Sequence, residues 1–386
     1  MPDSSPIFVI YEIGLLMVVS SLSLELFKRV QLPGLIGPVL VGLVIGGPGG
    51  LGLVTSLTVI QVLGVLGAVL ILFVVGLEFE ASELWKSGRA AFLITTGGVV
   101  AALSMGYAAG CLLGWSTPAA FFLGVVMAPS GTSVVASVLS AEGQVDSKAG
   151  QTLLTACVVD DVEGVLLLSI ASAMISDPTL SMHEGARIVV LAVFFIVASI
   201  YLGNRLFPMF ISRFARILSD EVFLAFFLGA GLIFAFVATQ AGLAAITGAF
   251  LIGAVIPYRK VGEKLSQRLH FMKEIFAAVF FADIGLSINP HDVIRFLPFA
   301  LLVCGTGISA RLTGGLLCGR IAGFSGRALA TMTVGLAIRA EMSLIIAREG
   351  VATGVVGSDF LSVAAMAVIL SMVLVTPIYS KLIRSM

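Results

Sequence analysis

Long apolar stretches, separated by short polar or Gly/Pro-containing breaks, follow one another along the whole 386-residue chain. Most stretches are near 20 residues long, the length a helix needs to cross a hydrocarbon core about 30 Å thick. Their apolar character is continuous, which excludes the alternating pattern of β-barrel strands. The pattern predicts an all-α polytopic membrane protein with about 13 transmembrane helices, at residues 6–27, 34–54, 57–77, 91–114, 118–140, 148–173, 185–207, 221–240, 242–257, 270–288, 295–319, 327–348 and 356–382.

Composition agrees with this pattern. The chain is 59% hydrophobic and 11% charged, with a mean hydropathy of +1.12, whereas soluble domains carry about 25% charged residues. The four cysteines fall inside apolar blocks without metal-site spacing, and the three histidines stand apart at block ends. We therefore expect no cofactor, no enzymatic activity and no nucleic-acid partner. The expected partners are the lipid bilayer, monovalent cations and protons.

The distribution of Lys and Arg predicts the orientation. An odd number of helices places the two termini on opposite sides of the membrane. With the N-terminus outside and the C-terminus cytoplasmic, 17 of the 22 Lys and Arg residues lie on the cytoplasmic side, 3 outside and 2 within helices. Because cytoplasmic loops are enriched in Lys and Arg, this orientation in the inner (plasma) membrane is strongly favoured over the reverse.

The sequence also repeats itself. Three pairs of matching positions are separated by 211, 209 and 208 residues: Gly42 and Gly253, Gly76 and Gly285, and Pro129 and Ala337. Seven predicted helices separate the partners, and this odd number gives the two repeats opposite topology. Two inverted-topology repeats, with interrupted helices crossing near the membrane midplane, are typical of secondary transporters.

Seven ionisable residues lie well inside the predicted helices. A charged side chain at that depth costs several kcal/mol, so each needs a partner or a function. Fully ionised, the group carries a net charge of −3, which calls for protons, a bound cation or water. This surplus favours cation over anion transport. The acidic members are Asp160, Asp161, Glu163, Asp283 and Glu341, and the basic members are Arg311 and Arg339.

Two consecutive aspartates are the sharpest feature. Side chains of neighbouring helical residues point about 100° apart, so Asp160 and Asp161 are expected to have different roles. Asp160 shares a helix face with Glu163. We interpret Asp161 as the Na⁺ ligand and proton acceptor, and Asp160 as the partner of Arg311. Because arginine is not deprotonated in proteins, Asp161 alone would alternate between proton and cation, which predicts electroneutral exchange.

The block 118–140 is expected to break at Pro129 and Gly131, since proline removes a backbone hydrogen bond and glycine tolerates strain. The hydroxyl groups that follow the break suit a hard cation, and we predict that Ser130, Thr132 and Ser133 contribute to the ion site.

The second break carries Arg339 and Glu341. We expect these two residues, with Glu163, to compensate charge by pairing with one another or with the helix ends. Asp283 either lines the ion pathway or is held neutral by hydrogen bonds.

Several short motifs together resemble those of the cation:proton antiporter-2 family, in particular its bacterial NapA-type sodium/proton antiporters. The resemblance covers the whole chain. Its pieces are Gly76-Leu77-Glu78, Gly131-Thr132-Ser133, Asp160-Asp161-Val162, Gly248-Ala249-Phe250, Phe280-Phe281 with Gly285, and Arg339-Ala340-Glu341.

This resemblance implies a homodimer with an elevator-type movement. It implies a dimerisation or scaffold domain at 1–90 and 221–290, an ion-translocating core domain at 91–173 and 295–386, and a linker helix at 185–207. It also implies that the second aspartate binds the ion and that the first pairs with a basic residue in the block 295–319. The chain departs from the family at three places. Arg311 stands where the family often has lysine, and Ile338 and Ala340 replace the proline and glycine of a frequent Pro-Arg-Gly-Glu motif. Glu163 and Asp283 stand where uncharged residues are usual.

The function predicted from these observations is exchange of Na⁺ or Li⁺ for H⁺. One alternative is a K⁺/H⁺ antiporter with the same site. Others are a Na⁺-coupled organic-anion symporter on a related fold, and a membrane sensor or assembly subunit that transports nothing.

Overall fold

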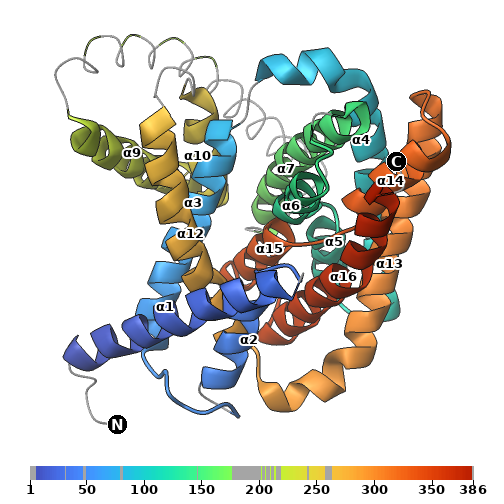
Figure 1. Ribbon diagram of the computed structural model, residues 1–386. Coiled ribbons are helices and arrows are strands. Elements are labelled where there is room, and N and C mark those ends of the chain that lie inside the picture. Colours follow the sequence, from blue (N-terminus) through green and yellow to red (C-terminus); the bar gives the residue numbers. More distant parts are fainter. Residues whose placement is uncertain are drawn as a thin grey trace. The chain divides into compact units, whose positions relative to one another are not determined.

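The computed structural model describes residues 6–175 except 31, 47–48, 79–80 and 146, residues 219–384 except 241–242 and 257–262, and the single residues 201, 205, 209 and 213. These residues form helices and no strand (Figure 1). The helices are α1 (Pro6–Arg29), α2 (Ile36–Ile45), α3 (Leu57–Glu78), α4 (Ala81–Leu112), α5 (Thr117–Val126), α6 (Thr132–Ala141), α7 (Lys148–Ile175), α9 (Asp220–Gln240), α10 (Ala245–Val255), α12 (Glu263–Leu286), the 3₁₀ turn η1 (Pro290–Asp292), α13 (Val293–Ile321), α14 (Gly326–Leu336), α15 (Glu341–Ala352) and α16 (Ser358–Arg384).

The all-helical prediction is confirmed for the described residues. Seven spans among them are long and apolar enough to cross a membrane, one of which comprises α14 and α15 together. Every predicted apolar block except 185–207 overlaps at least one of the helices given above. That block lies outside the described residues apart from two single positions, so the number of 13 transmembrane helices stays a prediction.

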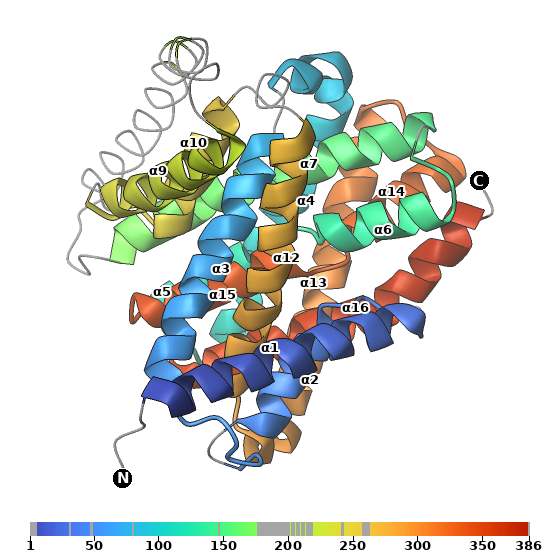
Figure 2. The same ribbon diagram turned by 60° about the vertical axis from the view of Figure 1, so that its left-hand side comes forward.

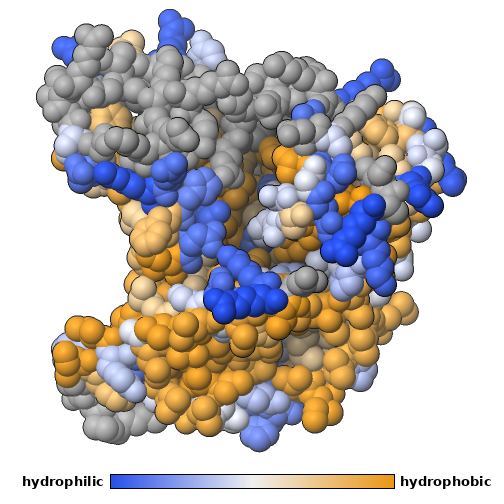
Figure 3. Space-filling view, in the orientation of Figure 1, coloured by the Kyte–Doolittle hydropathy of each residue, from blue (hydrophilic) through white to orange (hydrophobic). Residues whose placement is uncertain are grey.

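Apolar side chains on the surface fit a lipid environment. Figure 3 shows apolar residues over α1, where Ile7 is 72% and Leu22 is 66% exposed. Soluble monomers rarely expose such contiguous apolar surface, because water makes it costly. In lipid the same surface is well solvated.

Contacts divide the chain into two compact units. Unit 1 comprises Met1–Ser21, Val54–Glu80 and Leu168–Asp283, and unit 2 comprises Leu22–Leu53, Ala81–Leu167 and Ile284–Met386. Three helices, α1, α7 and α12, therefore continue from one unit into the other. The units differ from the expected domains in two ways: residues 22–53, 81–90 and 284–290 of the expected scaffold fall in unit 2, and residues 168–173 of the expected core fall in unit 1. The functional division into scaffold and core stays a prediction.

In unit 2, α4 packs closely along α13. A Cβ atom on Gly314 would lie 2.2 Å from the carbonyl oxygen of Gly97, so the absence of a side chain is what allows this approach. Arg311 lies three residues before Gly314 on the same helix. The close approach therefore brings its guanidinium group against the backbone of α4.

The interrupted helices also belong to unit 2. Residues 127–131 separate α5 from α6, and residues 337–340 separate α14 from α15 (Figure 2). Helices α5 and α14 begin at Thr117 and Gly326, and α6 and α15 begin at Thr132 and Glu341. The separation is 209 residues in both cases.

In unit 1, α1 supplies a carboxylate to the start of α3. Glu12 is fully buried, and its Oε1 accepts hydrogen bonds from Thr55 N–H at 2.7 Å and from the Thr55 hydroxyl at 2.8 Å. Its Oε2 accepts from Ser56 N–H at 3.0 Å. A carboxylate is favourable at a helix N-terminus, because backbone N–H groups there have no acceptor within the helix. The sequence pattern does not indicate this role of Glu12.

Candidate functional site

The two helix breaks touch each other. Gly131 N–H donates to the carbonyl oxygen of Ile338 at 2.7 Å. A Cβ atom on Gly131 would lie 2.7 Å from Cβ of Ala340, so the breaks meet too closely for any larger residue. Arg339 N–H donates to the Ser371 hydroxyl at 3.0 Å, which fixes the second break to α16. This crossing is the frame on which the predicted site residues are arranged.

Asp160 and Arg311 form a buried ion pair. Asp160 is 0% and Arg311 is 1% exposed. Arg311 Nη2 donates to Asp160 Oδ1 and to the carbonyl oxygen of Ala128, and its Nη1 donates to the carbonyl oxygen of Thr95 at 3.4 Å. Ser130 N–H donates to Asp160 Oδ2 at 2.7 Å. Asp160 is therefore held from two sides, by a permanent cation and by the backbone of the first break.

Asp161 has a different environment. It is 3% exposed, and its Oδ2 accepts a hydrogen bond from the Thr132 hydroxyl at 2.9 Å. Thr132 is the first residue of α6. The structure thus brings Asp161 of α7 to the point where α6 begins, with a neutral hydroxyl group as its partner there.

Glu341 lies on the other side of the same helix start. Its Oε1 accepts from Ser133 N–H at 3.0 Å and its Oε2 accepts from the Ser133 hydroxyl at 2.8 Å. Glu341 is the first residue of α15, so its side chain joins the beginnings of α15 and α6. Ser133 and Ser130 were predicted as ion ligands. The Ser130 hydroxyl is directed to Cys157 Sγ at 3.9 Å.

Arg339 binds carbonyl groups just after the end of α5 and one in the middle of α13. Its Nη1 donates to the carbonyl oxygens of Pro129 at 2.9 Å and Ala128 at 3.3 Å, and its Nη2 donates to that of Gly307 at 3.1 Å. Of the expected partners for Arg339, the helix ends are therefore the ones for which the structure gives hydrogen bonds.

Glu163 contacts α4. Its Oε1 accepts a hydrogen bond from the Thr96 hydroxyl, and its Oε2 is buried without a hydrogen-bond partner among the described residues. The shared face of Asp160 and Glu163 is thus turned toward α4 and α13, since Thr96 and Arg311 come from those helices.

Charges follow the polarity of the broken helices. Carbonyl groups at the end of α5 accept hydrogen bonds from Arg311 and Arg339. Backbone N–H groups around the start of α6 donate hydrogen bonds to the carboxylates of Asp160 and Glu341. Each helix end carries about half an elementary charge of the opposite sign to its partner. Asp161 accepts a hydrogen bond at the same helix start from the hydroxyl group of Thr132.

Asp283 is placed in unit 1, on α12. It is buried and packs on Gly64 of α3, where a Cβ atom would lie 2.9 Å from Asp283 Oδ2. Unit 2 contains the other predicted site residues.

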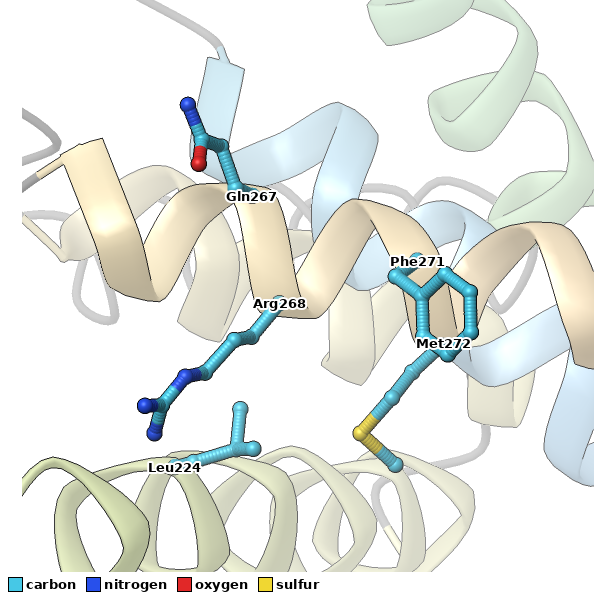
Figure 4. A pocket seen from close by; sticks show the side chains of 5 residues that line it. All are labelled: Leu224, Gln267, Arg268, Phe271 and Met272. Atoms are coloured by element: carbon cyan, nitrogen blue, oxygen red, sulfur yellow. The ribbon is translucent and has the colours of Figure 1, made fainter.

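Unit 1 also contains a cavity of ≈ 550 Å³ between α9 and α12. Figure 4 shows Leu224 on α9 and Gln267, Arg268, Phe271 and Met272 on α12 around it. Arg268 Nη1 pairs with Glu221 Oε1 at 3.2 Å. The cavity thus has a mixed lining and holds none of the predicted site residues.

Three contributors to the site were not predicted from the sequence. On α4, the carbonyl oxygen of Thr95 accepts a hydrogen bond from Arg311, and the Thr96 hydroxyl donates one to Glu163. On α16, the Ser371 hydroxyl accepts a hydrogen bond from the backbone N–H of Arg339 in the second break. The adjacent Thr95-Thr96 pair, inside an apolar block and followed by Gly97-Gly98, is the signal that could have indicated the first two. Ser371 has no comparable local signal.

Comparison with known proteins gives a consistent result. Residues 14–382 match the family model for the sodium/hydrogen exchanger transmembrane region. The chain is similar to the Na⁺/H⁺-K⁺ antiporter GerN of Bacillus cereus, with 25% identity over 95% of this chain and 94% of the relative. It is equally similar to a Na⁺/H⁺ antiporter of Enterococcus hirae, with 25% identity over 95% and 96% of the two chains.

The fold is that of a solved relative. The structure of the sodium proton antiporter MjNhaP1 from Methanocaldococcus jannaschii matches with a TM-score of 0.79 and 16% identity, over 98% of each chain. At this identity the likeness establishes the architecture of the chain.

Proposed function

This chain belongs to the sodium/hydrogen exchanger family of multi-pass membrane transporters, and from that premise we propose that it exchanges Na⁺ or Li⁺ for protons at Asp161. Such an antiporter needs one group that binds either ion but not both. A buried carboxylate fulfils this requirement, because desolvation makes its bare charge costly and either a proton or a cation removes the cost.

One observation carries the proposal: the two adjacent aspartates have different partners. Asp160 is bound by Arg311 and by Ser130 N–H, whereas Asp161 accepts from the Thr132 hydroxyl at the crossing of the broken helices. The Thr132 hydroxyl can turn to offer an oxygen lone pair to a cation and a hydrogen to the empty carboxylate. Thr132 is therefore a ligand in the proposed site, and Na⁺ is the transported substrate.

The proposed exchange is electroneutral. Arg311 keeps its charge throughout, so Asp160 stays ionised and does not carry a proton. Asp161 then releases one proton for each monovalent cation that it binds. An inward current on addition of Na⁺ to a reconstituted bilayer would contradict this stoichiometry.

Alternating access is proposed to follow an elevator-type movement of a core domain, at 91–173 and 295–386, against a scaffold at 1–90 and 221–290 in a homodimer, with the N-terminus outside. The common separation of 209 residues between α5 and α14, and between α6 and α15, supports two inverted repeats with crossing broken helices. Such repeats commonly place the ion site at the crossing.

The direct test is cation-dependent collapse of a pH gradient in proteoliposomes. Na⁺ and Li⁺ should each dissipate the gradient with purified wild-type protein, and protein-free liposomes serve as the control. If no cation has any effect, the proposed function is wrong.

Asp161→Asn should reduce this exchange to the background of protein-free liposomes. Asparagine keeps the hydrogen bond to Thr132 but carries no charge, so it cannot hold a proton or a cation in alternation. Exchange by Asp161→Asn at the wild-type rate would reject the assignment of Asp161.

K⁺/H⁺ exchange is a second candidate, because the relative GerN is described as a Na⁺/H⁺-K⁺ antiporter. The same proteoliposome assay separates the two. A response to K⁺ larger than the response to Na⁺ would favour the second candidate.

A further inference from the structure

The methyl group of Ala340 lies between the backbones of the two helix breaks. Ala340 is 0% exposed and directly precedes α15. Opposite it lies Gly131, where a Cβ atom would be 2.7 Å from Cβ of Ala340. Two carbon atoms in ordinary contact lie about 3.5–4.0 Å apart. The space between the breaks therefore accommodates one methyl group but not two.

Thr132 follows Gly131 directly, and both of its neighbours in the chain are bound by the second break. Gly131 N–H donates to the carbonyl oxygen of Ile338 at 2.7 Å. On the other side, the N–H and the hydroxyl of Ser133 donate to Glu341 at 3.0 and 2.8 Å. The position of Thr132 is therefore set by how closely the second break approaches the first.

This position matters for the cation because Thr132 faces Asp161. The Thr132 hydroxyl donates to Asp161 Oδ2 at 2.9 Å, and Asp161 belongs to a third helix, α7. In the proposed exchange, both groups offer oxygen atoms to the cation. The size of the cation that they accept depends on the distance between them and on how easily that distance increases.

The methyl group of Ala340 restrains that distance. Protein interiors are close-packed, so loss of a buried methyl group leaves a void that the neighbouring atoms fill only in part. Here the void would adjoin Gly131. The backbone of Gly131 and Thr132 could then shift, and the Thr132 hydroxyl would no longer be held at one distance from Asp161.

We propose that Ala340 is a positioning residue that sets the size of the cation accepted at Asp161: its methyl group holds Gly131, and through it Thr132, at a fixed distance from the carboxylate. The inference deepens the proposed exchange at Asp161 and rests on it. Ala340 acts without contact to the cation. Its effect is to favour Na⁺ and Li⁺ over the larger K⁺.

The variant Ala340→Gly removes this methyl group. We expect the ratio of the KM for K⁺ to the KM for Na⁺, measured by collapse of a pH gradient in proteoliposomes, to fall by about fivefold, the factor that corresponds to loss of one buried methyl group. A purely structural effect would change exchange of all cations alike and would leave the ratio at its wild-type value. An unchanged ratio would therefore contradict the proposal.

The double variant Ala340→Gly with Gly131→Ala returns a methyl group to the same space from the opposite side. The new Cβ atom would lie 3.3 Å from the nitrogen of residue 340 and 3.4 Å from the carbonyl carbon of Arg339, so small shifts accommodate it. Gly131 has a φ of −90°, which alanine adopts without strain. The double variant should recover the wild-type ratio. If it keeps the ratio of Ala340→Gly, the methyl group is not what sets the cation size.

Two single variants complete the comparison. Gly131→Ala alone adds a second methyl group 2.7 Å from the first, and should slow exchange of every cation. Ala347→Gly removes a fully buried methyl group from α15 away from the break, and should keep the wild-type ratio. A fall of the ratio in Ala347→Gly equal to that in Ala340→Gly would overturn the inference, because any loss of packing in α15 would then suffice.

Thermal stabilisation by cations gives a readout that does not depend on transport. Wild-type protein in detergent should need more K⁺ than Na⁺ for the same rise in melting temperature, and the two concentrations should approach each other in Ala340→Gly. Unchanged cation dependence of both melting and exchange in Ala340→Gly would reject the role of Ala340. Absence of exchange with every cation in the wild type would instead reject the proposed function, so the two failures are distinguishable.

Discussion

Asp160 and Asp161 are neighbours in the sequence, yet their side chains are bound in two unlike ways. Asp160 accepts hydrogen bonds from the Arg311 guanidinium group and from a backbone N–H group. Both Asp160 and Arg311 are almost completely buried. Asp161 accepts a hydrogen bond from the hydroxyl group of Thr132. Removal of one partner of a buried ion pair leaves an uncompensated charge, which costs about 3–5 kcal/mol. The first aspartate is therefore expected to matter for stability and the second for exchange.

The variant Asp160→Asn should lower the stability of the protein by about 3–5 kcal/mol, because Arg311 would remain buried without its counter-charge. Thermal unfolding in detergent measures the change. Asp161→Asn is the matched control, and it should be less destabilising. The double variant Asp160→Asn with Arg311→Met should recover part of the loss, whereas strictly additive losses would show that the two side chains do not act as a pair.

For single residues, the sequence predicted those properties that depend only on neighbouring residues in the chain. The different directions of Asp160 and Asp161 follow from 100° per residue in a helix, and the structure gives them different partners. The partners of Arg339 and Glu341 could not be chosen from the sequence, because they depend on how two distant breaks meet. Glu12 was not predicted either, because its partners Thr55 and Ser56 are 43 and 44 residues away in the chain, just before the start of α3.

Among the helices, the two breaks have different causes. Pro129 and Gly131 interrupt α5 and α6 through the backbone itself, and this break was predicted from composition. The second break, at Ile338, Arg339 and Ala340, contains neither proline nor glycine. It is stabilised by two tertiary hydrogen bonds, from Gly131 N–H to the carbonyl oxygen of Ile338 and from Arg339 N–H to the Ser371 hydroxyl oxygen. Only its correspondence with the first break made it predictable.

The far end of α6 is joined to α16 by Glu142, which lies just beyond the last residue of α6. Arg384 Nε donates to Glu142 Oε1 at 2.7 Å, and the Ser380 hydroxyl donates to the same oxygen at 2.9 Å. Hydrogen bonding from Arg384, with a smaller contribution from Ser380, holds the pKa of the Glu142 carboxyl below its usual value. Glu142 itself lies outside the candidate membrane spans.

A lowered pKa means that the folded protein favours the ionised form of Glu142. The contact therefore stabilises the fold at pH values above the usual pKa of glutamate, and the stabilisation is lost as the pH falls through the lowered pKa. Glu142→Gln should melt slightly below wild type at neutral pH, and the difference should shrink in acid. Melting curves of both proteins at several pH values test this. A difference independent of pH would indicate that the charge of Glu142 is irrelevant.

On the scale of the whole molecule, the helix that carries both aspartates is shared by the two compact units. Asp160 and Asp161 lie in the part of α7 that belongs to unit 2, and Ser169 lies in the part that belongs to unit 1. The hydroxyl groups of Ser169 and Thr247 are 2.9 Å apart and fully buried. The end of α7 is thus bound to α10 within unit 1.

In the proposed elevator-type movement, Ser169 belongs to the core and Thr247 to the scaffold, so a covalent link in place of this contact should stop exchange. The double variant Ser169→Cys with Thr247→Cys should form a disulfide on oxidation, since side chains in hydroxyl contact are near the required separation. We expect the oxidised double variant to lose exchange of Na⁺ and H⁺ in proteoliposomes and the reduced double variant to retain it. Oxidised wild type controls for Cys111, Cys157, Cys304 and Cys318. Similar rates in the oxidised and reduced double variants would contradict a movement that separates the end of α7 from α10.

The sequence predicted an all-helical membrane protein with broken helices, because apolar length and Pro/Gly breaks are local properties. It did not predict that α1, α7 and α12 would each belong to two units, since the helices are uninterrupted at those points. Which contacts a continuous helix makes along its length depends on packing partners that are distant in the chain.

The attachment of α7 to α10 also bears on how often that contact must break. Ser169 lies eight residues after Asp161 on the same helix, a rise of about 12 Å at 1.5 Å per residue. If the core moves against the scaffold as proposed, the hydroxyl groups of Ser169 and Thr247 have to separate during the movement. Breakage and re-formation of this one buried hydrogen bond would then accompany every turnover.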